Sequence, residues 1–147
     1  MTCLGIDTYW LSVDPGVKYY AWALWRGGAL LSCDVSEIDL RINPPDVNLL
    51  VIEDQEIRPR SRARSGDIIH LAQSAGRIAD RYREVYWYQY GHWAGQLSAD
   101  KVRKRTLKAL TEAGRDLILR HSKGDQAHIV EAVGIGLYYL RRVGCSR

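Results

Sequence analysis

The segment LSVDPGVKYYAWALWRGG (residues 11–28) decides the first part of the fold. Its first residues are typical of a strand, the DPG triplet at 14–16 is typical of a turn, and an aromatic strand then runs to two glycines at 27–28. The apolar segment 29–35 follows those glycines directly. Strands joined by short glycine-rich turns are typical of an antiparallel meander, so we expect three antiparallel strands here.

Asp14 has two interpretations within this stretch. An isolated Asp-Pro-Gly triplet is more often a turn than a functional site, because Pro and Gly suit the central turn positions. Asp14 is also a carboxylate at the end of a predicted strand, where it can serve as a metal ligand. Asp7 follows a similar apolar run, but a sheet beginning there would contain an extra strand before the glycine turn. We therefore expect Asp7 to be a surface charge.

Beyond the meander, the chain alternates strands and helices. Residues 47–53 form a nearly continuous apolar run that ends in Glu53, which indicates a strand buried on both faces. The later patterns predict a helix over 67–84, an aromatic strand over 85–90, a helix over 98–114 with Ser98 as its cap, and a helix over 124–142 with Asp125 as its cap. This order indicates a mixed α/β fold, with residues 1–147 as one domain.

The composition favours a soluble globular protein. Hydrophobic residues make up 46% of the 147 residues and charged residues 26%, and no apolar run is long enough to span a membrane. The N-terminal residues lack the pattern of a secretory signal, so we expect none. Cys3, Cys33 and Cys145 are an odd set without metal-ligand spacing, which favours reduced thiols in a cytoplasm, the host's cytoplasm if a phage encodes the chain.

The positive charge is clustered along the chain. The net charge is +4, and basic residues gather at 58–64 and 101–108. Such runs indicate a polyanionic partner, although a solvated surface explains any one of them equally well. The candidate phosphate contacts are Arg58, Arg60, Arg62, Arg64, Lys101, Arg103, Lys104 and Arg105.

Acidic residues recur at positions where a carboxylate charge is expected to be partly buried and is unfavourable without a partner. Asp14 and Glu53 end predicted strands, and Glu131 lies on the last predicted helix, three residues after His128. Residues three apart project from the same side of a helix. Converging carboxylates repel one another unless a cation neutralises them, and hard oxygen ligands suit Mg²⁺ or Mn²⁺. Taken alone, Glu53 can equally pair with a nearby arginine, and His128 is more often an ordinary surface histidine.

The acidic segments LSVDPG, LLVIE and QAHIVEAVGIG resemble, in the same order, those of RuvC-type Holliday-junction resolvases of the RNase H-like superfamily. The helical segment IIHLAQSAGRI is also similar to a segment of that family, and the resemblance covers roughly residues 11–140. It implies a five-stranded mixed sheet, three antiparallel strands plus parallel ones, flanked by helices. It also implies a two-metal site for Mg²⁺ or Mn²⁺.

The resemblance assigns a role to each candidate residue. Asp14 would bridge two ions, Glu53 would hold the ion beside the attacking water, and Glu131 would hold the ion near the leaving oxygen. His128 would ligate a metal or accept a proton. Lys101 matches one of two lysines that bacterial members carry near the site, and the other has no match here. His128 and Glu131 replace aspartates of the family pattern, and a softer imidazole favours Mn²⁺ at least as much as Mg²⁺.

The implied function is an endonuclease of DNA recombination and repair that resolves four-way junctions as a homodimer. Water would attack a phosphodiester and leave 5′-phosphate and 3′-hydroxyl ends, with no small-molecule cofactor and no membrane partner. The dimer interface would lie on the helix containing the small residues 74–76. Glu56 stands where bacterial members carry an aromatic, so Ile57 or the arginines of 58–64 would have to open the junction. We expect the aromatic run 86–93 to be a core strand and its edge, with base stacking by Trp93 as the alternative. An RNA-processing nuclease of the same superfamily and a junction-binding protein without catalysis are the alternatives.

Overall fold

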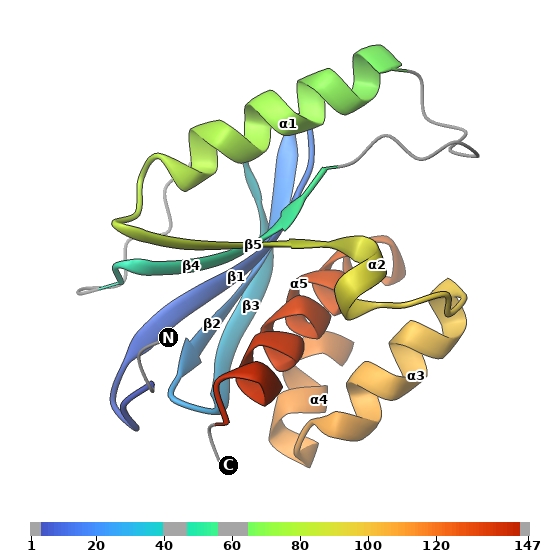
Figure 1. Ribbon diagram of the computed structural model, residues 1–147. Helices are drawn as coiled ribbons and strands as arrows, with labels where there is room; N and C mark the ends of the chain where they lie inside the picture. The colour runs from blue at the N-terminus through green and yellow to red at the C-terminus, as the bar shows by residue number, and fades with distance from the viewer. Residues whose placement is uncertain (1–3, 40–46, 56–64, 145–147) are drawn as a thin grey trace.

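The computed structural model describes residues 4–39, 47–55 and 65–144. Five strands and five helices occur there in an order that starts with a strand meander and ends with a long helix (Figure 1). The elements are β1 (Tyr9–Pro15), β2 (Tyr19–Arg26), β3 (Ala29–Glu37), β4 (Leu49–Asp54), α1 (Ser65–Ala79), β5 (Glu84–Gln89), α2 (Tyr90–Trp93), α3 (Ala99–Ala109), α4 (Glu112–Leu119) and α5 (Lys123–Arg142).

The strands form one sheet in the order β3-β2-β1-β4-β5. β1 pairs with β2 and β2 with β3 in antiparallel fashion, which confirms the predicted meander. β1 pairs with β4 and β4 with β5 in parallel. The predicted five-stranded mixed sheet is therefore confirmed, and β1 and β4 are neighbours at its centre.

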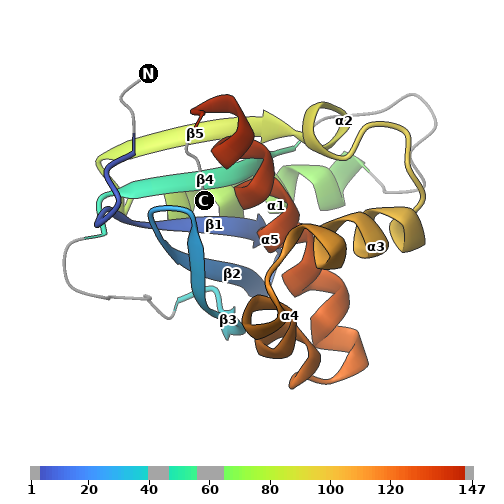
Figure 2. The ribbon, with the colours of Figure 1, turned by 90° about the horizontal axis from the view of Figure 1, so that it is seen from below.

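Helices cover both faces of the sheet. α1 packs on one face, and α2–α5 lie on the other, with α5 directly against the strands (Figures 1 and 2). Side chains along β1 alternate between the two cores: Trp10 packs in the core under α5, whereas Leu11 and Val13 pack in the core under α1. The same alternation along β4 explains why its run is apolar throughout, as expected of a strand buried on both faces.

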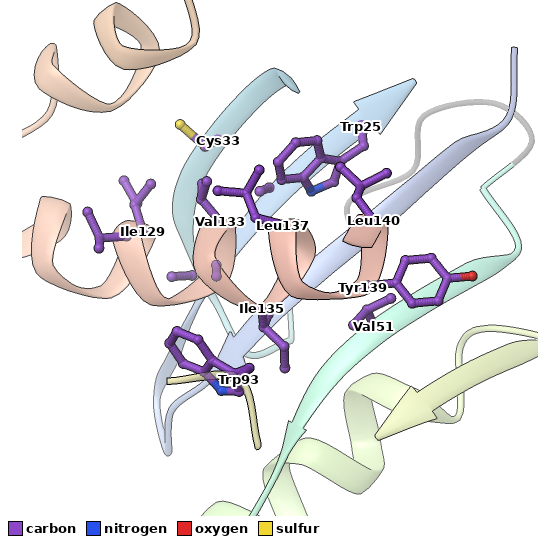
Figure 3. Close-up of a cluster of buried hydrophobic side chains, with 14 of the residues drawn as sticks. Trp25, Cys33, Val51, Trp93, Ile129, Val133, Ile135, Leu137, Tyr139 and Leu140 are labelled. Atoms are coloured by element: carbon purple, nitrogen blue, oxygen red, sulfur yellow. The ribbon is translucent and has the colours of Figure 1, made fainter. Parts of the chain in front are cut away.

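The core under α5 is built around aromatic side chains. Trp10 and Trp25 stack with ring centroids 5.1 Å apart, and Tyr139 of α5 meets Trp10 edge-on. Figure 3 shows Trp25, Val133 and Leu137 gathered between the helix and the strands. Trp25 also donates a hydrogen bond of 2.8 Å from Nε1 to Oγ of buried Ser12. This polar contact fixes how the indole is oriented below the helix.

The structure corrects the expected turn after β1. β1 continues through Pro15, and Asp14 pairs with Ala21 inside the antiparallel ladder. The chain turns only after Gly16, where an added Cβ would lie 2.2 Å from the carbonyl oxygen of Tyr19. Proline has no N–H to donate, and its place at a strand end is one that tolerates it. Asp14 is therefore a strand residue, and only Gly16 serves the turn.

The prediction of one helix over residues 98–114 is wrong, because α3 ends at Ala109 and a second helix, α4, begins at Glu112. The side chain of Thr111 caps α4 by accepting a hydrogen bond from the N–H of Gly114, so Gly114 lies in a first turn and ends no helix. Ser98 precedes α3 but makes no side-chain cap bond. Ser122, and not Asp125, caps α5 by accepting from the N–H of Asp125.

No helix within the described ranges is both long and apolar enough to cross a membrane.

Candidate metal centre

Two acidic residues leave the sheet side by side at its central strands. In the parallel pairing of β1 with β4, Val13 lies opposite Ile52, and each of these residues is followed by an acidic one, Asp14 and Glu53. Val13 and Ile52 belong to the core under α1. Because successive side chains of a strand point to opposite faces, Asp14 and Glu53 point to the face covered by α5.

Helix α5 brings His128 and Glu131 to the same place. Gly136 allows the helix to approach the sheet closely, because a Cβ there would lie 2.7 Å from both Ser12 Oγ and the Trp25 ring. A Cβ on Gly134 would lie 2.6 Å from the ring of Trp93. Glu131 and His128 lie one and two turns before this close contact, so their side chains reach the ends of the central strands.

The three side chains converge. A carboxylate oxygen of Asp14, a ring nitrogen of His128 and a carboxylate oxygen of Glu131 all lie within 4.8 Å of one another. Nδ1 of His128 lies 3.4 Å from Oδ2 of Asp14. The side chain of Asp14 is 12% exposed and that of His128 is 66% exposed, so the cluster has a buried base and an open side.

The electrostatics show that negative charge is costly at this point. Burial, and after it the charge of Asp14, raises the pKa of Glu131 to about 8. The hydrogen bond to Asp14 raises the pKa of His128 above its ordinary value, against the opposing effect of burial. Without a bound cation, the cluster therefore relieves its charge by holding protons on Glu131 and His128.

The donor atoms suit a divalent cation. Two carboxylates and an imidazole are ligands for Mn²⁺, and the carboxylates are ligands for Mg²⁺. The pKa of Glu131 is raised to about 8 because its charged form is unfavourable here. A bound cation would stabilise that charged form and so take the place of the proton. The residues present therefore fit the divalent ions expected from the sequence.

Glu53 lies in the same cleft but outside this trio. A cleft of about 420 Å³ is lined by Glu53 together with Asp14, His128 and Glu131. Among the described residues, the ligand atoms within 4.8 Å of one another come from the other three. The structure thus brings the four expected residues to one cleft and places Glu53 at its wall.

Sequence patterns did not reveal three further residues of this cleft, namely Lys18, Tyr19 and Gln55. Lys18 lies in the connection between β1 and β2, Tyr19 is the first residue of β2, and Gln55 follows β4. The sequence carries a signal for them only after Asp14 and Glu53 are recognised, because each lies within five positions of one of these acids. Lys18 places an exposed ammonium group at the cleft.

The four candidate phosphate contacts on α3, namely Lys101, Arg103, Lys104 and Arg105, divide into two groups. Lys101 and Lys104 are exposed, whereas Arg103 donates a hydrogen bond of 2.7 Å to Gln126 and Arg105 donates one of 2.8 Å to the carbonyl oxygen of Trp93. Lys101 does not line the cleft that contains Asp14. The two arginines thus hold helices together, and the two lysines face solvent.

Other candidates fall outside the described residues or inside the core. The expected phosphate contacts of the first basic run, Arg58, Arg60, Arg62 and Arg64, lie outside the described residues, as do Glu56 and Ile57. Trp93 is only 4% exposed, so the interpretation of Trp93 as a base-stacking side chain is wrong. Asp7, expected as a surface charge, is exposed and pairs with Arg26.

Comparisons with known proteins reveal a shared fold. No protein-family model matches the sequence, and no curated protein matches it. Among solved structures, the chain is similar to RuvC of Thermus thermophilus, with a TM-score of 0.54 at 15% identity over 95% of this chain and 99% of that one. It is also similar to T. thermophilus RuvC in complex with a Holliday junction substrate, with a TM-score of 0.56 at 15% identity over 95% and 98% of the two chains.

The chain therefore has a RuvC-like fold of the RNase H-like type, as the order of its motifs predicted.

Proposed function

We propose that this protein is a metal-dependent, structure-selective DNA endonuclease that resolves four-way junctions by paired nicks. Residues 1–147 would form one nuclease domain. The supporting observation is the convergence of Asp14, His128 and Glu131 within 4.8 Å at the end of β1, in a fold shared with a protein whose structure was solved with a Holliday junction. A four-way junction is therefore the substrate that the fold favours.

The residues of the cleft divide the chemical work. Asp14 and Glu131 would hold the cations, with Glu53 completing the site from its wall. Divalent cations held by these residues would supply an activated water and stabilise the leaving oxygen. His128 would ligate a cation or accept the proton of the water, and it must be neutral for either task. Lys18, which also lines the cleft, would contact a phosphate of the substrate.

The exposed lysines of α3 would bind DNA outside the cleft. Lys101 and Lys104 lie three positions apart on the solvent side of the helix, so both can reach one phosphate backbone. Arg103 and Arg105 are hydrogen-bonded within the protein and would contribute less than the lysines. Binding should weaken steeply with salt, because each neutralised phosphate releases counterions.

The test is a cleavage assay on a synthetic four-way junction in Mg²⁺ and in Mn²⁺. The wild-type protein should cut the junction into ligatable duplexes with 5′-phosphate and 3′-hydroxyl ends, and Mn²⁺ should support at least the rate seen in Mg²⁺. Asp14→Asn should retain junction binding but cleave more than ~100-fold more slowly. Changing a residue that only supports a metal ligand lowers activity by ~10–100-fold, and changing the ligand itself should lower it further.

Asp7→Asn provides the matched control, because Asp7 is an exposed aspartate on the surface and pairs with Arg26 instead of lining the cleft. It should cleave as the wild type does. Normal cleavage by Asp14→Asn would overturn the proposed metal site. Cleavage of structured RNA in preference to the junction would favour an RNA-processing nuclease, and junction binding without cleavage in either metal would favour a binding protein.

A further inference from the structure

A second hollow adjoins the metal centre on the other side of α5. It is a groove of about 580 Å³ between α3, α5 and the end of α4. Its walls are largely apolar and come from Ala99 and Val102 of α3, Leu119 of α4, and Ala127 and Val130 of α5. Its volume falls within the range of pockets that bind small molecules. The groove is therefore large enough for a flat ring system.

The groove and the metal cleft share one residue. Glu131 lines both hollows. A ligand bound at the metal centre can therefore extend past this side chain into the groove. Figures 1 and 2 show α3 lying beside α5. Residues of α5 line both hollows. A ligand in the groove is thus a direct neighbour of whatever is held at Asp14 and Glu131.

Two of the polar side chains that line the groove, Gln126 and Arg103, are held by hydrogen bonds. Gln126 is buried, donates to the carbonyl oxygens of Leu119 and His121, and accepts from Arg103. A guanidinium has five N–H donors, and the bond to Gln126 uses one of them. Arg103 and Lys123 supply donors at this edge, and Asp100 supplies an acceptor. An aromatic ring with polar edges matches this combination of apolar walls and fixed polar groups.

We propose that this groove holds a nucleobase unstacked from the DNA strand that is cut at the metal centre. The inference rests on the proposed nuclease function and specifies how the enzyme reads its substrate. A phosphate does not fit the apolar walls, whereas a base presents an apolar face and a polar edge. Unstacking costs least where base pairing or stacking is already disturbed, as at a branch point. Arg103 and Asp100 then make the groove a site that selects the base beside the cut.

The first experiment compares a filled groove with an open one. Ala99 is the exposed first residue of α3, and Ala99→Trp places a bulky ring in the groove. The matched control is Ala113→Trp, because Ala113 is an exposed residue of α4 that does not line the groove. Each protein is assayed on an intact junction and on junctions with an abasic site placed in turn at each nucleotide flanking the cleaved phosphate. Ala99→Trp should cut the intact junction roughly tenfold or more slowly than the control. At one abasic position, the two variants should cut equally fast.

The second experiment requires no cleavage. Junctions carrying 2-aminopurine at the same nucleotides are bound without divalent cations, and fluorescence should rise at one position for the wild type and Ala113→Trp but not for Ala99→Trp. Equal cleavage of the intact junction by both variants would overturn the proposal, as would a loss that persists on every abasic substrate. If Ala99→Trp instead abolishes dimerisation in sedimentation, the groove belongs to a second copy, and the proposal fails. Absence of all cleavage by the wild type would refute the nuclease function and leave the fluorescence result to decide about the groove.

Discussion

At the scale of single residues, Glu131 is the clearest sign that this cleft is built for a cation. Its carboxyl group is largely buried, and the charge of Asp14 lies nearby, so the pKa of Glu131 rises to about 8. A structural carboxylate is usually placed beside an arginine or a helix N-terminus, which lowers its pKa. Glu131 has the opposite surroundings, and its charge is favourable only when a cation neutralises it.

This pKa gives a stability prediction for the protein without divalent ions. The pKa of Glu131 is raised from 4.5 to about 8, so between these values the folded state holds a proton that the unfolded state releases. The free energy of unfolding should therefore fall as pH rises across this window, and the raised pKa of His128 acts in the same direction above pH 6.5. The melting temperature should be several degrees lower at pH 8.5 than at pH 5.5.

Adding Mn²⁺ should raise the melting temperature more at pH 8.5 than at pH 5.5, because the cation replaces a proton only where the proton is weakly held. Glu131→Gln removes this titration, so its melting temperature should depend less on pH and respond less to Mn²⁺. A variant whose pH dependence equals that of the wild type would show that Glu131 does not titrate in this window.

At the scale of elements, α5 positions both the core and the site. The absence of side chains at Gly134 and Gly136 allows the helix to contact Trp93, Ser12 and Trp25 directly. This close approach fixes the height of the helix above the sheet. The reach from α5 to Asp14 is therefore set by two glycines that lie well away from the metal ligands.

Gly136→Ala tests this arrangement. The added methyl would lie 2.7 Å from Ser12 Oγ and from the Trp25 ring, both in the buried core, so the helix must move outward. The free energy of unfolding should fall by about 1–3 kcal/mol in chemical denaturation, as for other overpacked cores. Gly124→Ala lies on the same helix with open space around its added Cβ, and should be neutral or stabilising by up to about 1 kcal/mol. Equal stability of the two variants would contradict a close-packed Gly136.

Local patterns predicted the meander, the buried strand ending in Glu53 and the α5 helix, because each has a strong period and clear ends. The break between α3 and α4 was missed, since neither Gly nor Pro marks it and the apolar spacing continues across Leu110. The cap of α5 was misplaced because Ser122 and Asp125 both suit the cap position. Burial of Trp93 depends on the space left by Gly134, forty-one positions later, which no local pattern reveals.

The candidate site was predictable in its residues but not in its geometry. The acids at strand ends, together with His128 and Glu131 on one helix, pointed to a common centre. The sequence could not show that Glu53 lies at the wall while the other three lie within 4.8 Å of one another. Their separation depends on how close α5 lies to the sheet, which is a tertiary property.

At the scale of the whole molecule, the outer surface of α1 is the candidate for self-association. Ser74 and Ala75 are buried against the sheet, so the small residues at 74 and 75 serve internal packing, and Gly76 is exposed. Ile69 is 55% exposed on the same helix. An exposed aliphatic side chain on a regular helix, about two turns from an exposed glycine, suits packing against a second copy.

Ile69→Glu should shift the protein from dimer to monomer in sedimentation, because it places a charge in the proposed interface. A monomer should nick a junction in one strand at a time, so nicked products should accumulate in place of resolved duplexes. Leu31→Glu on β3 is the control, being another exposed aliphatic side chain, and it should leave both measurements unchanged. A wild-type protein that sediments as a monomer would refute the dimer outright.

The double role of α5 has a consequence for when the protein becomes active. Asp14 lies on β1, the first strand of the described chain, whereas His128 and Glu131 lie on α5, its last helix. In a chain whose α5 is not docked on the sheet, Asp14 is separated from His128 and Glu131. Such a chain would not bind the cations between these residues. The proposed cleavage of DNA would therefore require the complete fold, with α5 docked on the sheet.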